Sequence, residues 1–239
     1  MHNGSTTSDV SDAVAAFMVA PHRGASYDAA RATARVLLHA ARRAATRLDA
    51  GAALIERTLA AYGDIPRTAQ SRAIIIAGDP ALRDEAAILG AAIAAAQLCR
   101  TSDDVLIGAI AVGRELQTRL RNSVGESAFR RIWNVDAALG VFGAVATAAR
   151  VLNLDASQAR NALGLAATQS AGIAATTGAT AGVVIGKAAA DAVEAAVLAS
   201  HGFTSSAASI EGRRGFAALM ATAFDRSAII ENLGENWTV

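Results

Sequence analysis

Alanine recurs along almost the whole of this 239-residue chain, in stretches such as GAAIAAAQLCR (90–100) and GKAAADAVEAAVLAS (186–200). Alanine has the highest intrinsic helix propensity, and its small side chain lets helices pack closely. Only three prolines interrupt the chain, and aromatic residues make up 4% of it. The sequence therefore predicts an all-α fold, a compact multi-helix bundle. We expect one helical domain over residues 9–239, preceded by a flexible N-terminus at residues 1–8.

Hydrophobic periodicity gives the positions of the expected helices. The pattern predicts helices from about Asp9–Asp12 to before Pro21, two within about 27–63 that break near Gly51, and others at about 82–98, 103–121, 138–152, 156–171, 187–201 and 213–222. RAIIIAGDP (72–80) is the one β-like stretch, and we interpret it as an extended connector. Asp155 and Gln158 form a capping-box pattern, Asp103 and Asp104 suit the N-terminal cap of the helix at 103–121, and glycines 140, 143, 164 and 186 indicate close helix contacts.

Charge and composition exclude several classes of function. The net charge of +1 provides no field that would attract nucleic acid, and no stretch has the length and flanks of a membrane span or a targeting signal. Cys99 is the single cysteine, so no internal disulfide forms. The four histidines lack metal-ligand spacing. We therefore expect a cytoplasmic protein that binds no nucleic acid, membrane, metal or cofactor.

Lys187 is the only lysine among the 22 cationic side chains. With Asp191 and Glu194 it occupies positions i, i+4 and i+7, which form one stripe along a helix. In a cleft this stripe would be a lysine with two carboxylates, able to move protons, with Lys187 and Asp191 as catalytic candidates. On the surface it would be an ordinary solvated face. Both interpretations stay open at this stage.

Four segments, in order, resemble a known family. They are SDDVLIGAIAVGRELQTRL (102–120), VDAALGVFGAVATAARVLNLDASQARNALGLAATQSAG (135–172), IGKAAADAVEAAVLASHGFTSSAASIEGRRGFAALMA (185–221) and LGENWTV (233–239). Together they are similar to the MmgE/PrpD family, which includes 2-methylcitrate dehydratase and cis-aconitate decarboxylase. The resemblance covers residues 85–239 well. It implies the family's large helical domain without its lid domain, a homodimer, and an active site that would lie between the two domains.

The resemblance also identifies where this chain departs from the family. The family's NGxxxHxLDFDD segment has lost its histidine and its acidic loop here. HPTGTxGxFGA reads NVDAALGVFGA, with Asn134 at the histidine position, and TKxxHxG reads TAGVVIG, with Ala181 at the lysine and Val184 at the second histidine. Lys187 lies beyond the catalytic lysine's position. A pocket with these replacements would be too apolar for a polycarboxylate, whose charges would lack partners.

Polar residues near the implied pocket remain candidates for a modified site. Asn134 is the third catalytic candidate, and the candidates for substrate binding are Asp136, Thr168, Gln169, Thr176, Thr177 and Thr180. Three functions stay open. The first is a repurposed lyase, isomerase or cyclase that acts on a less charged small molecule, in a setting such as specialised biosynthesis. The second is a non-catalytic subunit that pairs with itself or with a full-length family member. The third is retained dehydratase or decarboxylase activity on a small polycarboxylate.

Overall fold

The structure, a computed structural model, describes residues 9–46, 50–61 and 68–238. The predicted flexible segment at residues 1–8 lies outside this part. The elements are α1 (Asp9–Val19), α2 (Ala25–Thr46), α3 (Ala50–Ala60), α4 (Ala69–Ala77), the 3₁₀ helix η2 (Pro80–Glu85), α5 (Ala86–Ala96), α6 (Asp103–Ser123), α7 (Glu126–Phe129), α8 (Val135–Ala138), α9 (Gly140–Val151), α10 (Ala156–Ala167), α11 (Gly178–Ser200), α12 (Phe216–Met220) and α13 (Ser227–Ile230). The predicted all-α fold is confirmed for these residues. None of their helices is long and apolar enough to cross a membrane.

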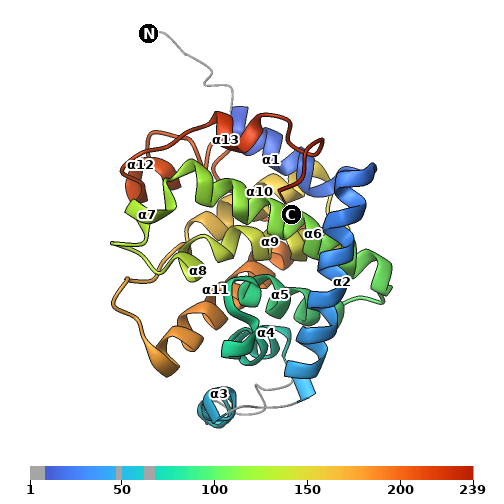
Figure 1. Cartoon of the computed structure of the whole chain (residues 1–239), viewed down its shortest axis with the longest axis vertical. Coiled ribbons are helices and arrows are strands. Elements are labelled where there is room, and N and C mark those ends of the chain that lie inside the picture. The colour runs from blue at the N-terminus through green and yellow to red at the C-terminus, as the bar shows by residue number, and fades with distance from the viewer. Residues whose placement is uncertain (1–8, 47–49, 62–67, 239) are drawn as a thin grey trace.

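Helix α9 forms the centre of the bundle. It packs against α5, α6, α10 and α11, and nearly all of its residues are buried. In Figure 1, α2 runs along one side of the bundle, α1 and α13 lie at one end, and α3 lies at the other end. Half of the residues in the main core cluster are alanine, so adjacent helices can approach closely, and leucine, isoleucine, valine and phenylalanine fill the spaces between them.

Two glycines show how closely the helices approach one another. A Cβ atom at Gly143 of α9 would lie 2.8 Å from the carbonyl oxygen of Gly113 on α6. A Cβ atom at Gly186 of α11 would lie 2.6 Å from the carbonyl oxygen of Ile74 on α4. Both distances are too short for any side chain, so the predicted role of these glycines in close helix contact is confirmed.

The predicted extended connector at residues 72–80 is wrong. Residues 69–77 form α4, which begins after the N-cap Thr68 and packs against both α5 and α11. Ile75 and Ile76 are buried by this packing. Tertiary burial therefore outweighs the weak preference of β-branched residues for strands. A turn does follow, because η2 begins at Pro80.

Of the other predicted boundaries, some are confirmed and some need correction. The predicted division of residues 27–63 into two helices near Gly51 is confirmed, because α2 ends at Thr46 and α3 begins at Ala50; residues 47–49 lie outside the described residues. Helix α11 begins at Gly178, nine positions before the predicted start at 187. The cap of α6 is Ser102, whereas Asp103 and Asp104 lie in its first turn and pair with Arg42 and Arg31 on α2. The predicted capping box of Asp155 and Gln158 is confirmed.

His22 lies in an aromatic cluster where α1, α2 and the end of the chain meet. Its ring is near Phe17, Tyr27 and Trp237, and its Nε2 lies 2.9 Å from the Phe17 carbonyl oxygen, to which it donates in the neutral form. Burial lowers the pKa of His22 below its ordinary value, and the charge of Arg150 lowers it further, although the bond to Phe17 opposes both.

This lowered pKa predicts that acid destabilises the fold. Below pH 6.5 the folded state binds fewer protons at His22 than the unfolded chain does. The contribution of His22 to stability is therefore present above pH 6.5 and is lost as the pH falls through the lower pKa that His22 has in the folded state. Urea unfolding on either side of pH 6.5 should show the free energy of unfolding decreasing toward acid. His22→Phe keeps an aromatic ring there and should flatten part of this dependence. An unchanged pH profile in the variant would contradict the assignment.

Candidate functional site

A cavity of about 440 Å³ lies between the start of α11 and the segment that joins α4 to α5. Its lining comes from α3, α4, η2, α5, α8 and α11, and consists of Ile55, Ala77, Gly78, Asp79, Pro80, Ala86, Asp136, Gly178, Ala179, Ala181, Gly182 and Ile185. We call it the Asp79–Asp136 cavity. Its walls are mainly apolar, and among the residues that the structure describes the two aspartates are the only ionisable side chains in this lining.

Glycines position α11 at this cavity. A Cβ atom at Gly182 would lie 2.9 Å from the carbonyl oxygen of Gly78, one helical turn before the close contact at Gly186. Gly178 begins the helix with a φ of 57°, in the left-handed region that glycine adopts readily. The absence of a side chain at Gly182 brings α11 directly against Gly78, the residue before Asp79.

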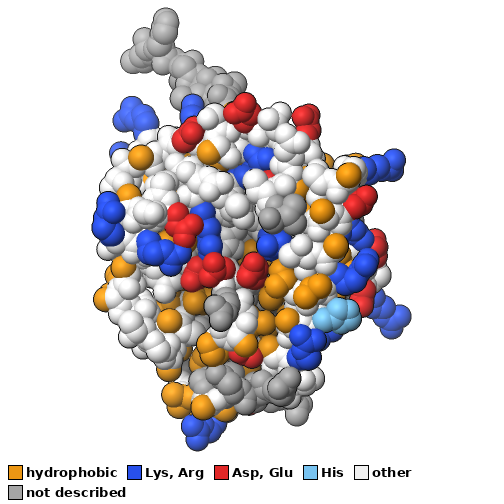
Figure 2. Space-filling model, viewed as in Figure 1, with side chains coloured by type: hydrophobic (Ala, Val, Ile, Leu, Met, Phe, Trp, Pro, Cys, Tyr) orange, Lys and Arg blue, Asp and Glu red, His pale blue; other side chains and the backbone are white. Residues whose placement is uncertain are grey.

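The two carboxylates are held in different ways. Asp79 is buried, and its Oδ1 accepts a hydrogen bond from the backbone N–H of Ala81 at 2.8 Å. Asp136 lies in the first turn of α8 and accepts a hydrogen bond from Arg121 Nη2 at 2.7 Å. Arg121 also binds Asp84 at 3.1 Å through Nη1. Acidic and basic side chains lie next to one another in this part of the molecule, over α7 and α8 in Figure 2.

The environment of Asp136 changes its acidity. Burial raises its pKa above the ordinary value for aspartate, and the nearby negative charge of Asp84 raises it further. Arg121 and Arg130 oppose this change with their positive charges. Asp136 therefore binds a proton at a higher pH than an exposed aspartate does, a property that suits a group that transfers protons.

Backbone donors lie at the same cavity. The first N–H groups of an α-helix have no acceptor within the helix, and the helix dipole makes this end partly positive. The N-cap residue of α11, Thr177, makes no side-chain capping bond. Gly178, Ala179 and Ala181 of this first turn line the cavity. The site thus combines carboxylates that can accept protons with a helix start that can stabilise a negatively charged oxygen.

Comparison with known proteins gives the family. The family model of the MmgE/PrpD N-terminal domain matches residues 80–228, which is more than half of the chain. The chain belongs to the MmgE/PrpD family. The curated proteins compared with it gave no significant match.

In this MmgE/PrpD chain, three of the positions that the resemblance matches to histidine or lysine in the family carry Asn134, Ala181 and Val184. Ala181 is in the lining of the cavity, and a Cβ atom built at Gly172 would lie 3.0 Å from Val184 Cγ1 and 3.3 Å from Asn134 Cβ. The cavity therefore lies beside residues that the resemblance places at the family site, and its identity with that site stays a prediction.

Lys187 lies in a different place, a surface groove of about 190 Å³. The groove brings together four predicted residues, Lys187, Asp191, Thr168 and Gln169, with Glu194 beside them. Lys187 Nζ is 2.8 Å from Asp191 Oδ1, and the lysine side chain is 61% exposed. This geometry is that of an exposed i, i+4 ion pair. It favours the solvated-face interpretation, and the catalytic role of Lys187 and Asp191 stays a prediction.

The other predicted site residues surround the start of α11 and α8. Asn134 is the N-cap of α8, where its side chain accepts a hydrogen bond from the N–H of Ala137 at 3.1 Å. Thr176 donates to the carbonyl oxygen of Ile173. Thr177 and Thr180 are exposed and flank lining residues of the cavity. Asp136 is the only predicted site residue in the lining, and the binding roles of all of them stay predictions.

Asp79 was not among the predicted site residues. It fell within the stretch interpreted as an extended connector, and nothing in the local pattern shows that α11 packs against this segment. The one available signal was an aspartate two positions after the apolar run at 73–77. In the described part of the chain, no group of three or more metal-ligating side chains is close enough to bind a metal ion.

Proposed function

We propose that this MmgE/PrpD chain is a lyase or isomerase that removes a proton from the carbon next to a carbonyl group in a neutral or cationic small molecule. One observation carries the proposal: in the described part of the chain, the ionisable lining of the cavity consists of two carboxylates, Asp79 and Asp136. A polycarboxylate would meet like charges there, and none of these described lining residues is cationic. Retained activity on small polycarboxylates is therefore the least favoured of the three possible functions.

Each group has a distinct role in the proposed reaction. The Asp136 carboxylate takes the proton, and the electron pair of the C–H bond moves toward the carbonyl oxygen to form an enolate. The free N–H groups at the start of α11 stabilise this oxygen, as preorganised donors do in oxyanion holes. Asp79 binds a hydroxyl or cationic group of the substrate and so orients it.

The enolate can then react in three ways. Expulsion of a β-substituent gives elimination, return of the proton from Asp136 to another position gives isomerisation, and attack on an electrophile in the same molecule gives cyclisation. The apolar remainder of the cavity selects by shape, since positioning alone lowers reaction barriers substantially. Such a reaction fits a biosynthetic step on a substrate less charged than a tricarboxylate.

Proton abstraction can be tested without knowledge of the natural substrate. The purified protein is incubated in D₂O with small ketones and esters, some with an amino group, and deuterium incorporation next to the carbonyl is followed by NMR. We expect exchange that depends on enzyme concentration for probes that bind, and none for citrate. Faster exchange for citrate than for the neutral probes would contradict the proposal.

A second candidate function is supported by an exposed apolar surface. Ile132, Ile173 and Leu219 have exposed fractions of 47%, 66% and 71%. They lie near one another because Trp133 pairs with Ile173 across a β-bridge, and Trp133 Nε1 donates to the carbonyl oxygen of Met220. Exposed apolar patches mark protein interfaces. We propose that this patch holds two copies of the chain together.

Leu219→Asp tests this interface. A carboxylate placed in an apolar interface loses its hydration without gaining a partner, so we expect sedimentation to show the dimer weakened at least about tenfold. Val36→Asp is the matched control, because Val36 is 67% exposed on α2, outside the patch. A monomeric parent protein, or an equal effect of both variants, would refute the proposed interface.

A further inference from the structure

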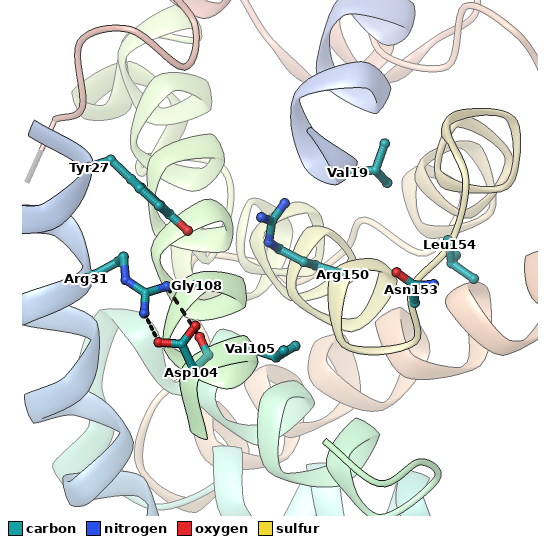
Figure 3. A pocket seen from close by; sticks show the side chains of 9 residues that line it. All are labelled: Val19, Tyr27, Arg31, Asp104, Val105, Gly108, Arg150, Asn153 and Leu154. Atoms are coloured by element: carbon teal, nitrogen blue, oxygen red, sulfur yellow. Dashed lines mark hydrogen bonds and ion pairs between the residues drawn. The ribbon is translucent and has the colours of Figure 1, made fainter. Parts of the chain in front are cut away.

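A second cavity, of about 230 Å³, lies where the end of α1, the starts of α2 and α6 and the end of α9 meet. Figure 3 shows its lining: Val19, Tyr27, Arg31, Asp104, Val105, Gly108, Arg150, Asn153 and Leu154. We call it the Gly108 cavity. In contrast to the Asp79–Asp136 cavity, two of its three charged side chains are arginines. None of its lining residues belongs to the proposed active site.

Three polar side chains from two helices, α2 and α9, converge on Gly108 of α6 at the floor of this cavity. A Cβ atom at Gly108 would lie 2.9 Å from Tyr27 Oη, 3.1 Å from Arg31 Nη1 and 3.8 Å from Arg150 Nε. Glycine at this position thus leaves open a space that a phenol and two guanidinium groups surround. Figure 3 shows these side chains coming from α2 and α9 on either side of α6.

The donors of Arg150 are only partly used by the protein. Its Nη1 donates to the carbonyl oxygens of Met18 and Ala20 at 3.1 and 2.8 Å, which fixes the side chain across the end of α1. Among the described residues, neither Nε nor Nη2 of Arg150 has a hydrogen-bond acceptor. A guanidinium held in this way is a preorganised donor for a planar or tetrahedral oxyanion.

Arg31 is bound to an exposed residue of α6 (Figure 3). Its Nη2 pairs with Asp104 Oδ1 and its Nη1 donates to the Asp104 carbonyl oxygen at 3.3 Å; the side chain of Asp104 is 79% exposed and that of Arg31 is 19% exposed. Water competes for the exposed carboxylate, which limits the free energy of this ion pair. An anion in the cavity can therefore share or replace Asp104 as the partner of Arg31 at small cost. With Asp104 counted, the lining still carries a net positive charge.

From this arrangement we infer that the Gly108 cavity is a binding site for a small molecule with a carboxylate or phosphate group. Arg150 and Arg31 bind its oxygens from two sides, and the Tyr27 hydroxyl donates a third hydrogen bond. Charge-assisted bonds of this kind are the strong ones in anion recognition. The cavity has room for about seven waters at the liquid volume of roughly 30 Å³ each, and so for a ligand of several non-hydrogen atoms.

Trp237 supplies an internal probe for this site. Its ring centroid is 4.7 Å from that of Tyr27, and the chain has only one other tryptophan, Trp133. In a Trp133→Phe background, fluorescence reports on the surroundings of Trp237 alone. The protein is titrated with inorganic phosphate and, separately, with succinate, with sodium chloride added to keep the ionic strength constant. A saturable response to phosphate alone, to succinate alone or to both supports the site and identifies the anion class.

Arg31→Gln and Arg150→Gln are expected to weaken this binding at least tenfold. Arg42→Gln is the matched control, because Arg42 also joins α2 to α6, through Asp103, but does not line the cavity. Circular dichroism checks that each variant is folded. If Arg150→Gln unfolds because it loses the contacts of Arg150 with the end of α1, the binding measured for Arg31→Gln alone tests the inference. No saturable response to either anion, or equal weakening by Arg42→Gln, would overturn the inference.

Discussion

Asp136→Asn is expected to slow deuterium exchange from a bound carbonyl probe by about 10²- to 10⁴-fold, the usual contribution of a positioned acid or base. The amide keeps the shape of the side chain and can still accept a hydrogen bond from Arg121, but it cannot take a proton from carbon. The cavity should therefore still bind the probe, and the loss should fall on the rate of exchange.

Asp84→Asn provides the matched control for this prediction. Asp84 binds the same arginine, Arg121, at 3.1 Å, but its side chain is 58% exposed and it does not line the cavity. Both substitutions remove one negative charge near Arg121. We expect Asp84→Asn to leave exchange nearly unchanged. Equal losses in the two variants would show that the effect is one of general charge and not of a base at Asp136.

The pH profile gives an independent check of the same role. A base must be deprotonated to act, so exchange by the parent protein should rise with pH as Asp136 loses its proton. Because burial raises the pKa of this carboxyl, the rise should be centred above the ordinary aspartate value of 3.8. Asp84→Asn removes a negative charge that raises the pKa of Asp136, so it should shift the midpoint of this rise toward lower pH. A rise centred below the ordinary value would contradict the assignment.

Arg119→Met is expected to lower the free energy of unfolding by about 3–5 kcal/mol, as the loss of one partner of a buried ion pair does. Arg119 Nε is 2.6 Å from Glu115 Oε1, and the two side chains are 6% and 1% exposed. Arg119 also donates to four backbone carbonyls between Ile229 and Asn236, at 2.7–3.2 Å. Glu115 Oε2 accepts two bonds from Thr238. This buried pair therefore fastens the end of the chain to α6.

Arg130→Met is the control that separates the effect of burial on the stability of an ion pair from the effects of residue type and spacing. Glu126 and Arg130 form an ion pair with the same residue types and the same i, i+4 spacing, but their side chains are far more exposed, at 35% and 52%. Exposed pairs of this kind contribute below about 1 kcal/mol. Urea unfolding of both variants measures the difference directly. Similar losses in the two would mean that the contacts of Arg119 with residues 229–236 contribute little.

Much of the fold follows from the chain's local chemistry. Alanine-rich periodicity predicted the helical class, and the capping box at Asp155 and the close contacts at Gly143 and Gly186 occur as expected. The prediction was wrong at α4, where three isoleucines suggest extended structure but packing against α5 and α11 stabilises a helix. The early start of α11 was also missed, because glycine and threonine at 177–182 weaken the helical signal there.

The candidate site was less predictable than the fold. The resemblance pointed to residues of which Ala181 and Asp136 line the cavity, and their roles stay predictions. Asp79 and the start of α11 meet at the cavity through tertiary contact between segments about 100 residues apart, so the local pattern gives little sign of this arrangement. Lys187 was conspicuous in the sequence because it is the only lysine, but this property carries no information about its position, which is exposed.

The most direct test of the account is an NMR titration in which the backbone amides of the cavity report binding. A small neutral carbonyl compound, one that undergoes exchange, is added to the ¹⁵N-labelled protein, and citrate is added to a second sample. The account predicts that the carbonyl compound shifts the amide signals of Ala179, Ala181 and Gly182, whereas citrate leaves them in place. Shifts of these amides by citrate, with none by the neutral compound, would contradict the claim that this family site now takes a less charged ligand.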